Sequence, residues 1–407
     1  MYKLMIAVSA IALSASMAQA EHQQTPTNVW QAWQQNAHEH AVPPAMDHRN
    51  PTKAEPFAPV KPENLTIRER RFKPHAVGQA AYVDQVGDNN NADINQTAAP
   101  GGSVADVIQL GNNNAASIEQ RGGFADHYGV VTQNGNNNGA AIRQYSDLVT
   151  GASYADIEQG GDHTNPNGTS GGPAGKANHN WASIDQGIGA GGVSVASFGN
   201  KAKIAQGTKG TNLVSDGNEA AIVQRGDEMR SLIEQDGSNN DASILQTGNN
   251  GGANLTVREQ NEARITQRGF VNLGVIEQDG QYQRAAMFQI GDNNKALIEQ
   301  DGNTTNAAAP GSPNTAFISQ TGNWNVSAIV QEGDNNMASN LQTGDWNVSS
   351  IWQDGDGNMA AVVQTGDYNS SLLDQTGNNN AASVSQNGFD VSNIQQTGNG
   401  NVVAVNQ

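Results

Sequence analysis

A repeat of eleven residues, which returns more faithfully after 22, constrains the fold of this chain more than any other feature. In the stretch QTGDWNVSSIWQDGDGNMAAVVQTGDYN (residues 342–369), Gln342, Gln353 and Gln364 lie eleven apart, and each is followed two places later by glycine. The letters QTGDWN return as QTGDYN after 22 residues. Self-similarity at a short fixed period is typical of solenoids, whose units bury their apolar faces against one another. The chain is therefore predicted to stack short repeating units.

The repeating unit, Q-x-G-x-x-N-x-A-x-I-x-Q, combines a strand with a turn. Counting from Gln320, glycine stands at offset 2, and Asn, a small residue, an aliphatic residue and the next Gln stand at offsets 5, 7, 9 and 11. Residues two apart face one side of an extended chain, so these four side chains are predicted to point inward from a strand. Glycine permits the positive φ that a tight corner needs. A helix is excluded by the period of two and by glycine in every unit.

Alternation between successive units predicts the shape of one coil. Trp324 and Trp346 share an offset with Asn335, and Met337 and Met359 lie 22 apart at another offset. Odd and even units therefore occupy different environments, as in a flattened coil of two strands and two turns. The predicted fold is an all-β, two-sheet β-solenoid of cross-β type, with strand-turn-strand coils of about 22 residues. The repeats correspond to roughly 26 to 28 strands in a rod near 65 Å long at the cross-β spacing.

Three sets of residues are predicted to form columns along this rod. Buried amides are costly alone, but in an in-register stack each amide can bond the identical amide above and below. The predicted amide ladder contains Gln320, Gln331, Gln342, Gln353, Gln364, Gln375, Gln386, Asn325, Asn336, Asn347, Asn358, Asn369 and Asn380. The predicted turn glycines are Gly322, Gly333, Gly344, Gly355, Gly366 and Gly377. The predicted aromatic edge is Trp324, Trp346 and Tyr368, either as a binding or packing surface or as turn-filling side chains that merely stack.

The residues before the repeats read differently. The stretch MYKLMIAVSAIALSASMAQA predicts a secretory signal peptide over residues 1–20, cleaved after Ala20 and too short to be a comfortable membrane span. Residues 21–77 are rich in Pro, Gln and Ala without a repeat, which predicts a mostly disordered segment. The repeats then run over residues 78–407, with loop insertions predicted near 160–178 and 301–313.

Charge and residue usage exclude several function classes. The formal net charge is −18, which argues against nucleic acid as a partner, and cysteine is absent, so neither disulfides nor thiolate metal sites stabilise the chain. His38 and His40 suggest at most a weak metal site, with solvated histidines as the simpler interpretation. The acidic turns lack the nine-residue, glycine-dense pattern of calcium-binding β-rolls. No nucleophile elbow, P-loop or zinc signature occurs, so no enzyme activity, cofactor or metal is predicted.

The ends of the repeat region predict self-association. Stable monomeric solenoids carry polar, atypical capping repeats, whereas QAAYVDQ (79–85) and NVVAVNQ (401–407) keep the pattern. Open strand edges template the addition of another chain. Glu277 and Glu299, 22 apart, are predicted to face outward and to slow assembly as gatekeepers, or else only to maintain solubility.

The repeats resemble a known family. The pattern is similar to the curlin repeat of bacterial curli fibres, here over Asn347, Gln353, Gly355, Asn358, Ala360 and Gln364. The family's unit begins with Ser, where Asn325, Asn347 and Asn369 stand in this chain. The N-terminal segment is longer and richer in Pro than the familiar one, and the repeats exceed the usual five. The similarity covers residues 78 to 407.

The resemblance implies a secreted structural subunit that self-assembles into functional amyloid fibres of the biofilm matrix, supporting adhesion and cell aggregation. It also implies other curlin subunits and a curlin-type outer-membrane pore with its chaperones as partners, and a location at the cell surface reached through the periplasm. Two alternatives stay open: a surface-associated nucleator of another curlin, and a soluble β-solenoid adhesin or binding module.

Overall fold

The computed structural model describes residues 79–98, 103–122, 127–146, 153–160, 177–187, 199–207, 215–226, 228–248, 261–302 and 313–407. These residues form strands and turns and contain no helix. The predicted signal peptide (1–20) and N-terminal segment (21–77) lie outside them, as do His38 and His40.

The strands form two sheets, in which all pairs of strands are parallel. The strands of the first, called sheet A, follow one another along the stack in the order β1 (Ala80–Val86), β3 (Val104–Leu110), β5 (His127–Asn136), β7 (Ser153–Gln159), β10 (Lys201–Gln206), β13 (Arg230–Ser238), β15 (Glu262–Phe270), β17 (Arg284–Ile290), β19 (Thr315–Thr321), β21 (Met337–Thr343), β23 (Met359–Thr365), β25 (Ala381–Asn387) and β27 (Val402–Asn406). Two short strands pair at one side of sheet A, β8 (Ala177–Asn178) and β11 (Ser215–Asp216).

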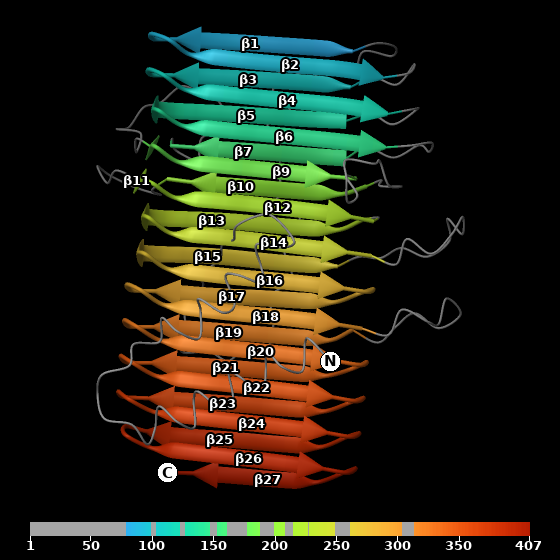
Figure 1. Cartoon of the computed structure of the whole chain (residues 1–407), viewed down its shortest axis with the longest axis vertical. Coiled ribbons are helices and arrows are strands. Elements are labelled where there is room, and N and C mark those ends of the chain that lie inside the picture. Colours follow the sequence, from blue (N-terminus) through green and yellow to red (C-terminus); the bar gives the residue numbers. More distant parts are fainter. Residues whose placement is uncertain are drawn as a thin grey trace, which may run out of the picture.

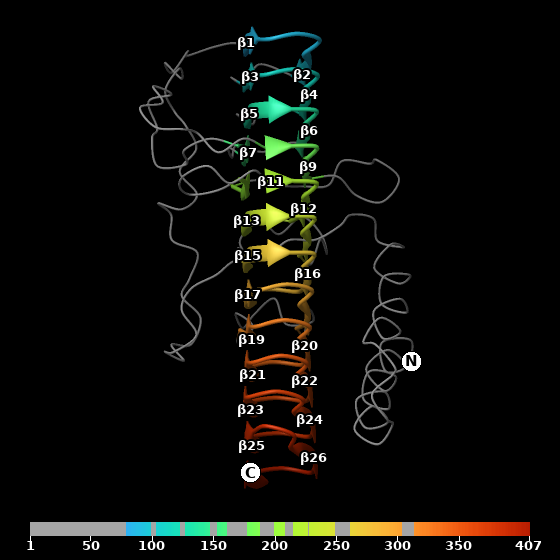
Figure 2. The ribbon, with the colours of Figure 1, turned by 90° about the vertical axis from the view of Figure 1, so that its left-hand side faces the viewer.

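The second, called sheet B, contains β2 (Asn91–Ala98), β4 (Ala115–Gly122), β6 (Gly139–Ser146), β9 (Trp181–Gln186), β12 (Glu219–Arg225), β14 (Asp241–Thr247), β16 (Leu273–Asp279), β18 (Lys295–Asp301), β20 (Val326–Glu332), β22 (Val348–Asp354), β24 (Ser370–Thr376) and β26 (Val391–Thr397). The chain alternates between the sheets, so each coil contributes one strand to each. Figure 1 shows the strands of the two sheets running in opposite directions, and Figure 2 shows the sheets as two thin walls facing each other.

Strand pairing follows the predicted coil. Gln342 of β21 pairs with Gln364 of β23, and Met337 pairs with Met359, each 22 residues apart. The prediction of an all-β, two-sheet β-solenoid is confirmed. The coil persists where the repeat is degenerate, because β10 places Gln206 in register with Gln159 of β7 and Gln235 of β13.

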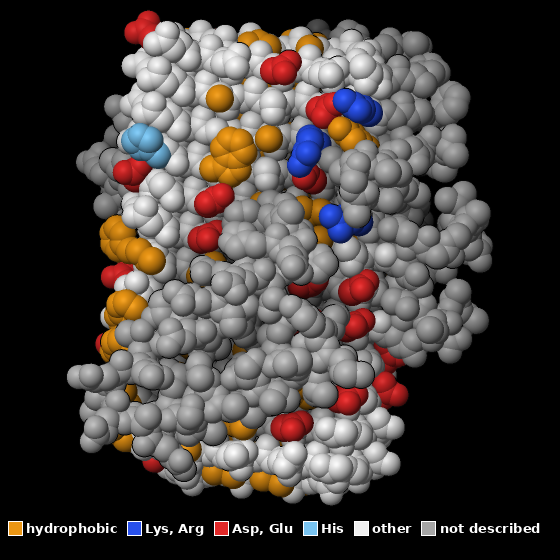
Figure 3. All heavy atoms as spheres, viewed as in Figure 1, with side chains coloured by type: hydrophobic (Ala, Val, Ile, Leu, Met, Phe, Trp, Pro, Cys, Tyr) orange, Lys and Arg blue, Asp and Glu red, His pale blue; other side chains and the backbone are white. Residues whose placement is uncertain are grey.

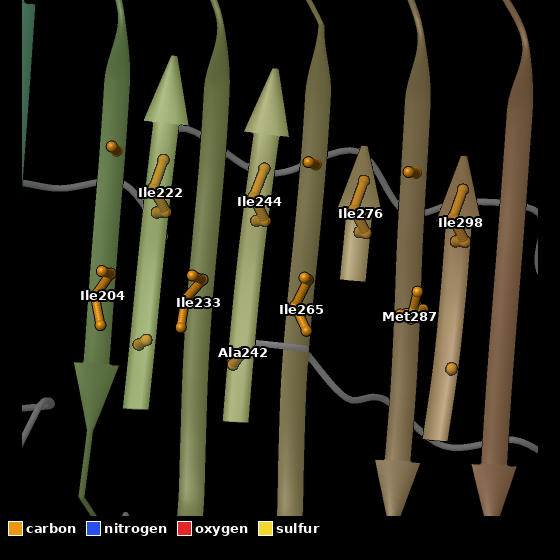
Figure 4. Close-up of a cluster of buried hydrophobic side chains, with 14 of the residues drawn as sticks. Ile204, Ile222, Ile233, Ala242, Ile244, Ile265, Ile276, Met287 and Ile298 are labelled. Carbon is orange, nitrogen blue, oxygen red and sulfur yellow. The ribbon is translucent and has the colours of Figure 1, made fainter. Parts of the chain in front are cut away.

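A thin apolar core lies between the sheets because alternate residues of every strand point inward. In Figure 4, one column from sheet A contains Ile204, Ile233, Ile265 and Met287, and the facing column from sheet B contains Ile222, Ile244, Ile276 and Ile298. All these side chains are buried. Small alanines such as Ala242 occupy the neighbouring inward position and allow the sheets to lie close together.

The turns lie on two edges, here called the A-to-B edge and the B-to-A edge after the direction of the chain. The predicted insertion near 160–178 lies between β7 and β9, on the A-to-B edge, and the one near 301–313 lies between β18 and β19, on the opposite edge. Most residues of both insertions lie outside the described ranges. The last two of the first, Ala177 and Asn178, form β8 and pair with the end of β5, so they extend the sheet.

Candidate functional site

Glutamine side chains form a continuous hydrogen-bonded column in sheet A. Each Nε2 donates to the Oε1 of the glutamine one coil later, over N···O distances of 2.6 to 3.2 Å. The column contains Gln85, Gln109, Gln133, Gln159, Gln206, Gln235, Gln267, Gln289, Gln320, Gln342, Gln364, Gln386 and Gln407. The ladder therefore extends far beyond the units that show it best in the sequence.

Sheet B carries an equivalent glutamine column. It contains Gln96, Gln120, Gln144, Gln186, Gln224, Gln246, Gln278, Gln300, Gln331, Gln353, Gln375 and Gln396. From Gln96 onward, the amides of both columns also donate to a backbone carbonyl across the core, as Gln342 does to Val326 O (3.0 Å) and Gln331 to Thr315 O (3.2 Å). These bonds satisfy buried amides that would otherwise cost free energy. They also join the two sheets.

Both glutamine columns have a direction. Within each column, every Nε2 that bonds another glutamine donates toward the C-terminal end of the stack. The column of sheet A therefore starts at the Oε1 of Gln85 and ends at the Nε2 of Gln407. No described residue lies beyond Gln396 or Gln407 in their columns. In sheet A, one end thus presents the Oε1 of Gln85 and the other presents the Nε2 of Gln407, which makes the two ends complementary.

The asparagines lie in the turns, immediately before each strand, instead of inside the strands. Asn336 Nδ2 donates to Gly355 O in the next coil (2.7 Å), and Asn336 Oδ1 accepts from the backbone N–H of Asn358 (2.9 Å). On the A-to-B edge a direct amide contact adds to this, from Asn347 Nδ2 to Asn325 Oδ1 (3.1 Å). The asparagines, which include Asn369 and Asn380, therefore connect each turn mainly to the backbone of its neighbours.

The turn glycines are required by the close approach of successive turns. Gly344 has φ +117°, and a Cβ built on it would lie 2.2 Å from Gly366 O. Gly355 has φ +115°, with its Cβ 2.3 Å from Gly377 O. No side chain fits at such distances. The same approach of a glycine carbonyl occurs at Gly322, Gly333 and Gly377.

Two residues after each such glycine, the backbone turns left-handed at a position that is often not glycine. Trp324, Trp346 and Tyr368 have φ of 60°, 61° and 60°. Asn335 and Asn379 occupy the equivalent position on the other edge. Asparagine tolerates this conformation well, so its frequency here was the signal by which the sequence could have identified the position.

The predicted aromatic edge is a stacked column on the A-to-B edge. Ring centroids of Trp324 and Trp346 lie 5.1 Å apart with planes 4° from parallel, and those of Trp346 and Tyr368 lie 6.3 Å apart. Phe389 extends the column, 5.4 Å from Tyr368. The sequence pattern did not predict Phe389 as a member of this column. The last turn on this edge is one residue shorter than the others, so Phe389 lies outside the 22-residue spacing.

Acidic side chains form in-register columns on the outer face of sheet B. Glu277 pairs with Glu299, and Asp301 lies between Asp279 and Glu332. Figure 3 shows acidic side chains on the visible face of the stack. Like charges at strand spacing repel one another. The column therefore opposes close stacking of further acidic strands.

Burial changes the protonation of another acidic residue of sheet B, Asp241. Asp241 of β14 pairs with Glu219 of β12. Burial, with a smaller contribution from the Glu219 charge, raises the pKa of the Asp241 carboxyl to about 7. Opposite charges meet elsewhere, as on sheet A, where Lys203 Nζ lies 3.3 Å from Asp156 and 3.1 Å from Glu158.

The two ends of the described stack present open strand edges. Within the described ranges, β1 and β2 each pair with one strand only, and so do β26 and β27. Side chains that point inward are buried in the middle of the stack but exposed at its ends. Val83 is 50% exposed, whereas Val107, its partner in β3, is fully buried. Such an edge is a template for a further strand.

The described part of the chain contains no group of three or more His, Cys, Asp or Glu side chains arranged to hold a metal ion. Within those residues, no helix has the length and apolarity of a membrane span.

A family model described as the curlin associated repeat matches residues 216–248, 272–302, 311–339, 341–366 and 358–388. These matches fall on the coils from β11 to β25. A comparison with curated protein sequences gave no match.

Proposed function

Because the chain is a curlin-family protein with multiple repeats, we propose that it is a structural subunit of curli-type functional amyloid fibres, in which copies add end to end. The single observation that carries this proposal is the directed glutamine column, which begins with acceptors at one end of the stack and ends with donors at the other. A second copy placed on either end extends the column without any change of fold.

Addition of a copy stabilises groups that are exposed in the free chain. The N–H and C=O groups of β1 and β27 gain ladder partners, and Val83 and Val405 are removed from water. Burial of apolar surface contributes about 25 cal/mol per Å², and each new backbone hydrogen bond contributes roughly 0.5–1.5 kcal/mol net. Because the new end is identical to the old one, growth continues.

The remaining parts of the proposal concern the setting. We propose that residues 1–20 direct export, that a curlin-type outer-membrane pore with its chaperones carries the chain outward, and that residues 21–77 contribute to that recognition. The fibres then belong to the extracellular matrix, where they support adhesion and cell aggregation alongside other curlin subunits. The curlin family, which is a family of structural subunits, supports this role in place of catalysis.

A Thioflavin T time course on the purified chain from Glu21, with electron micrographs of the endpoint, tests the proposal. The expected result is a lag phase, fibres, and a lag shortened by sonicated seeds. A chain that stays monomeric, β-rich and dye-silent for days would contradict it, and a soluble binding module would then be the better account.

A further inference from the structure

Given fibres of the kind proposed above, we infer that successive copies are related by a rotation of 180° about the fibre axis. In this arrangement β1 of the incoming copy pairs with β26, and its β2 pairs with β27. The two sheets thus exchange roles at every junction between copies. Three separate features of the described stack lead to this arrangement.

The first feature is the number of strands in each sheet. Sheet A has 13 strands in its ordered path and sheet B has 12, so the described stack ends half a coil beyond a whole number of coils. If an incoming copy kept the same orientation, β1 on β27 would leave one strand position empty between β26 and β2. After a rotation of 180°, β1 fills the next position in sheet B and β2 the next in sheet A. The rotation also preserves parallel pairing, because the two sheets run in opposite directions (Figure 1).

The second feature is the length of the turns that meet at the junction. The turn from β1 to β2 contains four residues, 87–90, with left-handed backbone at Asn89. In the rotated arrangement it stacks on the turn from β26 to β27, which also has four residues, 398–401, with left-handed backbone at Gly400. In the unrotated arrangement it would meet residues 388–390, a turn of three residues.

The third feature is the asparagine column at each edge. On the B-to-A edge, the backbone N–H of Asn401 donates to Asn380 Oδ1 (3.0 Å). In the rotated arrangement, Asn401 Oδ1 accepts from the backbone N–H of an incoming Asn90 in the same way. On the A-to-B edge the column ends in Asp390, whose Oδ2 accepts from the N–H of Asn387 (2.9 Å). A carboxylate has no N–H to donate to the glycine carbonyl of a following turn. The amide pattern therefore continues only on the edge that the rotation selects.

The inward side chains also match in the rotated arrangement. If the junction keeps the register found between the coils inside the stack, Gln396 pairs with Gln85, Ile394 with Val83 and Ser392 with Ala81. In the facing sheet, Gln407 meets Gln96 and Val405 meets Ile94. Both glutamine columns then cross the junction unbroken, whereas the unrotated arrangement interrupts the column of sheet B.

Paired cysteines distinguish the two arrangements, since the chain has no cysteine of its own. Asp84, Gln395 and Asn406 are exposed, and Asp84 lies at the opposite end of the stack from the other two, so a disulfide from position 84 to either of them forms only between copies. The rotated arrangement places Asp84 beside Gln395, and the unrotated one places it beside Asn406. In-register neighbours lie about 5 Å apart, within the Cα range of a disulfide. The variants to compare are Asp84→Cys/Gln395→Cys and its matched control Asp84→Cys/Asn406→Cys.

Fibres of each double variant are assembled under reduction, oxidised and analysed on a non-reducing denaturing gel. The rotated arrangement predicts a ladder of covalent oligomers for Asp84→Cys/Gln395→Cys and monomer for the control. A ladder from the control alone, or fibres in which neither pair links, would overturn the inference while leaving fibre formation intact. Helical reconstruction of unmodified fibres gives the rotation between copies without any substitution. Absence of fibres from the unmodified chain would instead refute the proposed function, and this inference with it.

Discussion

Gln342 and Gln364 lie one coil apart, and Nε2 of Gln342 donates a hydrogen bond of 2.9 Å to Oε1 of Gln364. Gln342 also accepts from Gln320 and donates to Val326 O across the core, and its side chain is fully buried. One side chain thus connects three coils and both sheets. Hydrogen-bonded side chains and the thin apolar core together join the coils of a chain that has no cysteine.

Replacing Gln342 by Leu tests this relationship. The substitution leaves Gln364 Oε1 and one N–H of Gln320 without their partners, and each unsatisfied buried group costs about 1–3 kcal/mol. The free energy of unfolding of freshly desalted monomer in urea is therefore expected to fall by roughly 2–5 kcal/mol. The partly exposed turn residue Gln281 provides a control, and Gln281→Leu is expected to change the free energy of unfolding by less than about 0.5 kcal/mol. Equal effects for the two variants would refute the ladder's role.

Turn glycines separate backbone strain from steric clash. Gly344→Ala places a Cβ 2.2 Å from Gly366 O, whereas Gly388→Ala, at φ +91°, meets nothing within 4 Å. Both pay for a left-handed backbone, about 1–2 kcal/mol, but only the first must also push two coils apart. Gly344→Ala is expected to abolish cooperative unfolding measured by circular dichroism, and Gly388→Ala to preserve it. Identical melting curves would contradict the close approach of the turns.

The aromatic column is expected to contribute little to stability. Trp346→Asn removes two stacked contacts, worth about 0.5–1.5 kcal/mol each, but installs a residue that tolerates the left-handed backbone. The free energy of unfolding should therefore change by no more than about 1 kcal/mol, while the exciton couplet of Trp324 and Trp346 in far-ultraviolet circular dichroism disappears. A loss of several kcal/mol would assign the column a structural role that it lacks in this account.

The acidic columns of sheet B are expected to slow assembly. Glu299→Gln removes one charge next to Glu277, so the Thioflavin T lag should shorten severalfold at low salt. At about 1 M salt the Debye length is only ~3 Å, and the difference should vanish. Lys295→Gln, in the same strand, removes a positive charge and should lengthen the lag. An unchanged lag in Glu299→Gln would leave solubility as the role of these acids.

Asp241 predicts a pH dependence of stability. Its pKa rises from the ordinary value of 3.8 to about 7 through burial and the facing Glu219, with Leu273 as its other neighbour in the sheet. The folded state therefore holds the proton more tightly than the unfolded state, and this contribution to stability is lost as the pH rises toward and through 7. The free energy of unfolding should fall over that range, and Asp241→Asn should flatten the curve. A parallel curve for the variant would place the dependence elsewhere.

The fold could be predicted from the sequence because the same 22-residue spacing occurs many times. The spacing of 22 that places Gln342 beside Gln364 recurs in the described coils from β15 onward, so single departures do not obscure it. It did not yield the odd strand number, since the parity depends on whether degenerate units such as β10 form strands. It also did not yield the position of Asp390 or the shortened last turn on the A-to-B edge, because one missing residue looks like ordinary variation in a loop.

The direction of the hydrogen bonds was equally out of reach. A glutamine column can in principle donate toward either end, and only the geometry across the core, such as the bond from Gln342 to Val326 O, selects one. The asparagines illustrate the opposite case. Asn336 and Asn358 recur at the predicted spacing, yet they precede the strands and bind turn backbone, which a pattern of alternate residues does not distinguish from the first inward position.

Mass per unit length of the thinnest filaments, measured by scanning transmission electron microscopy, tests end-to-end stacking most directly. The stack contains twelve and a half coils, which is about 60 Å at the strand spacing. A chain of 42.7 kDa over that length predicts a mass per unit length of about 0.7 kDa per Å. That value means one chain per cross-section, with each copy continuing the stack of the last. A value several times larger in the thinnest filament would mean that the copies do not add end to end, and the account would be wrong.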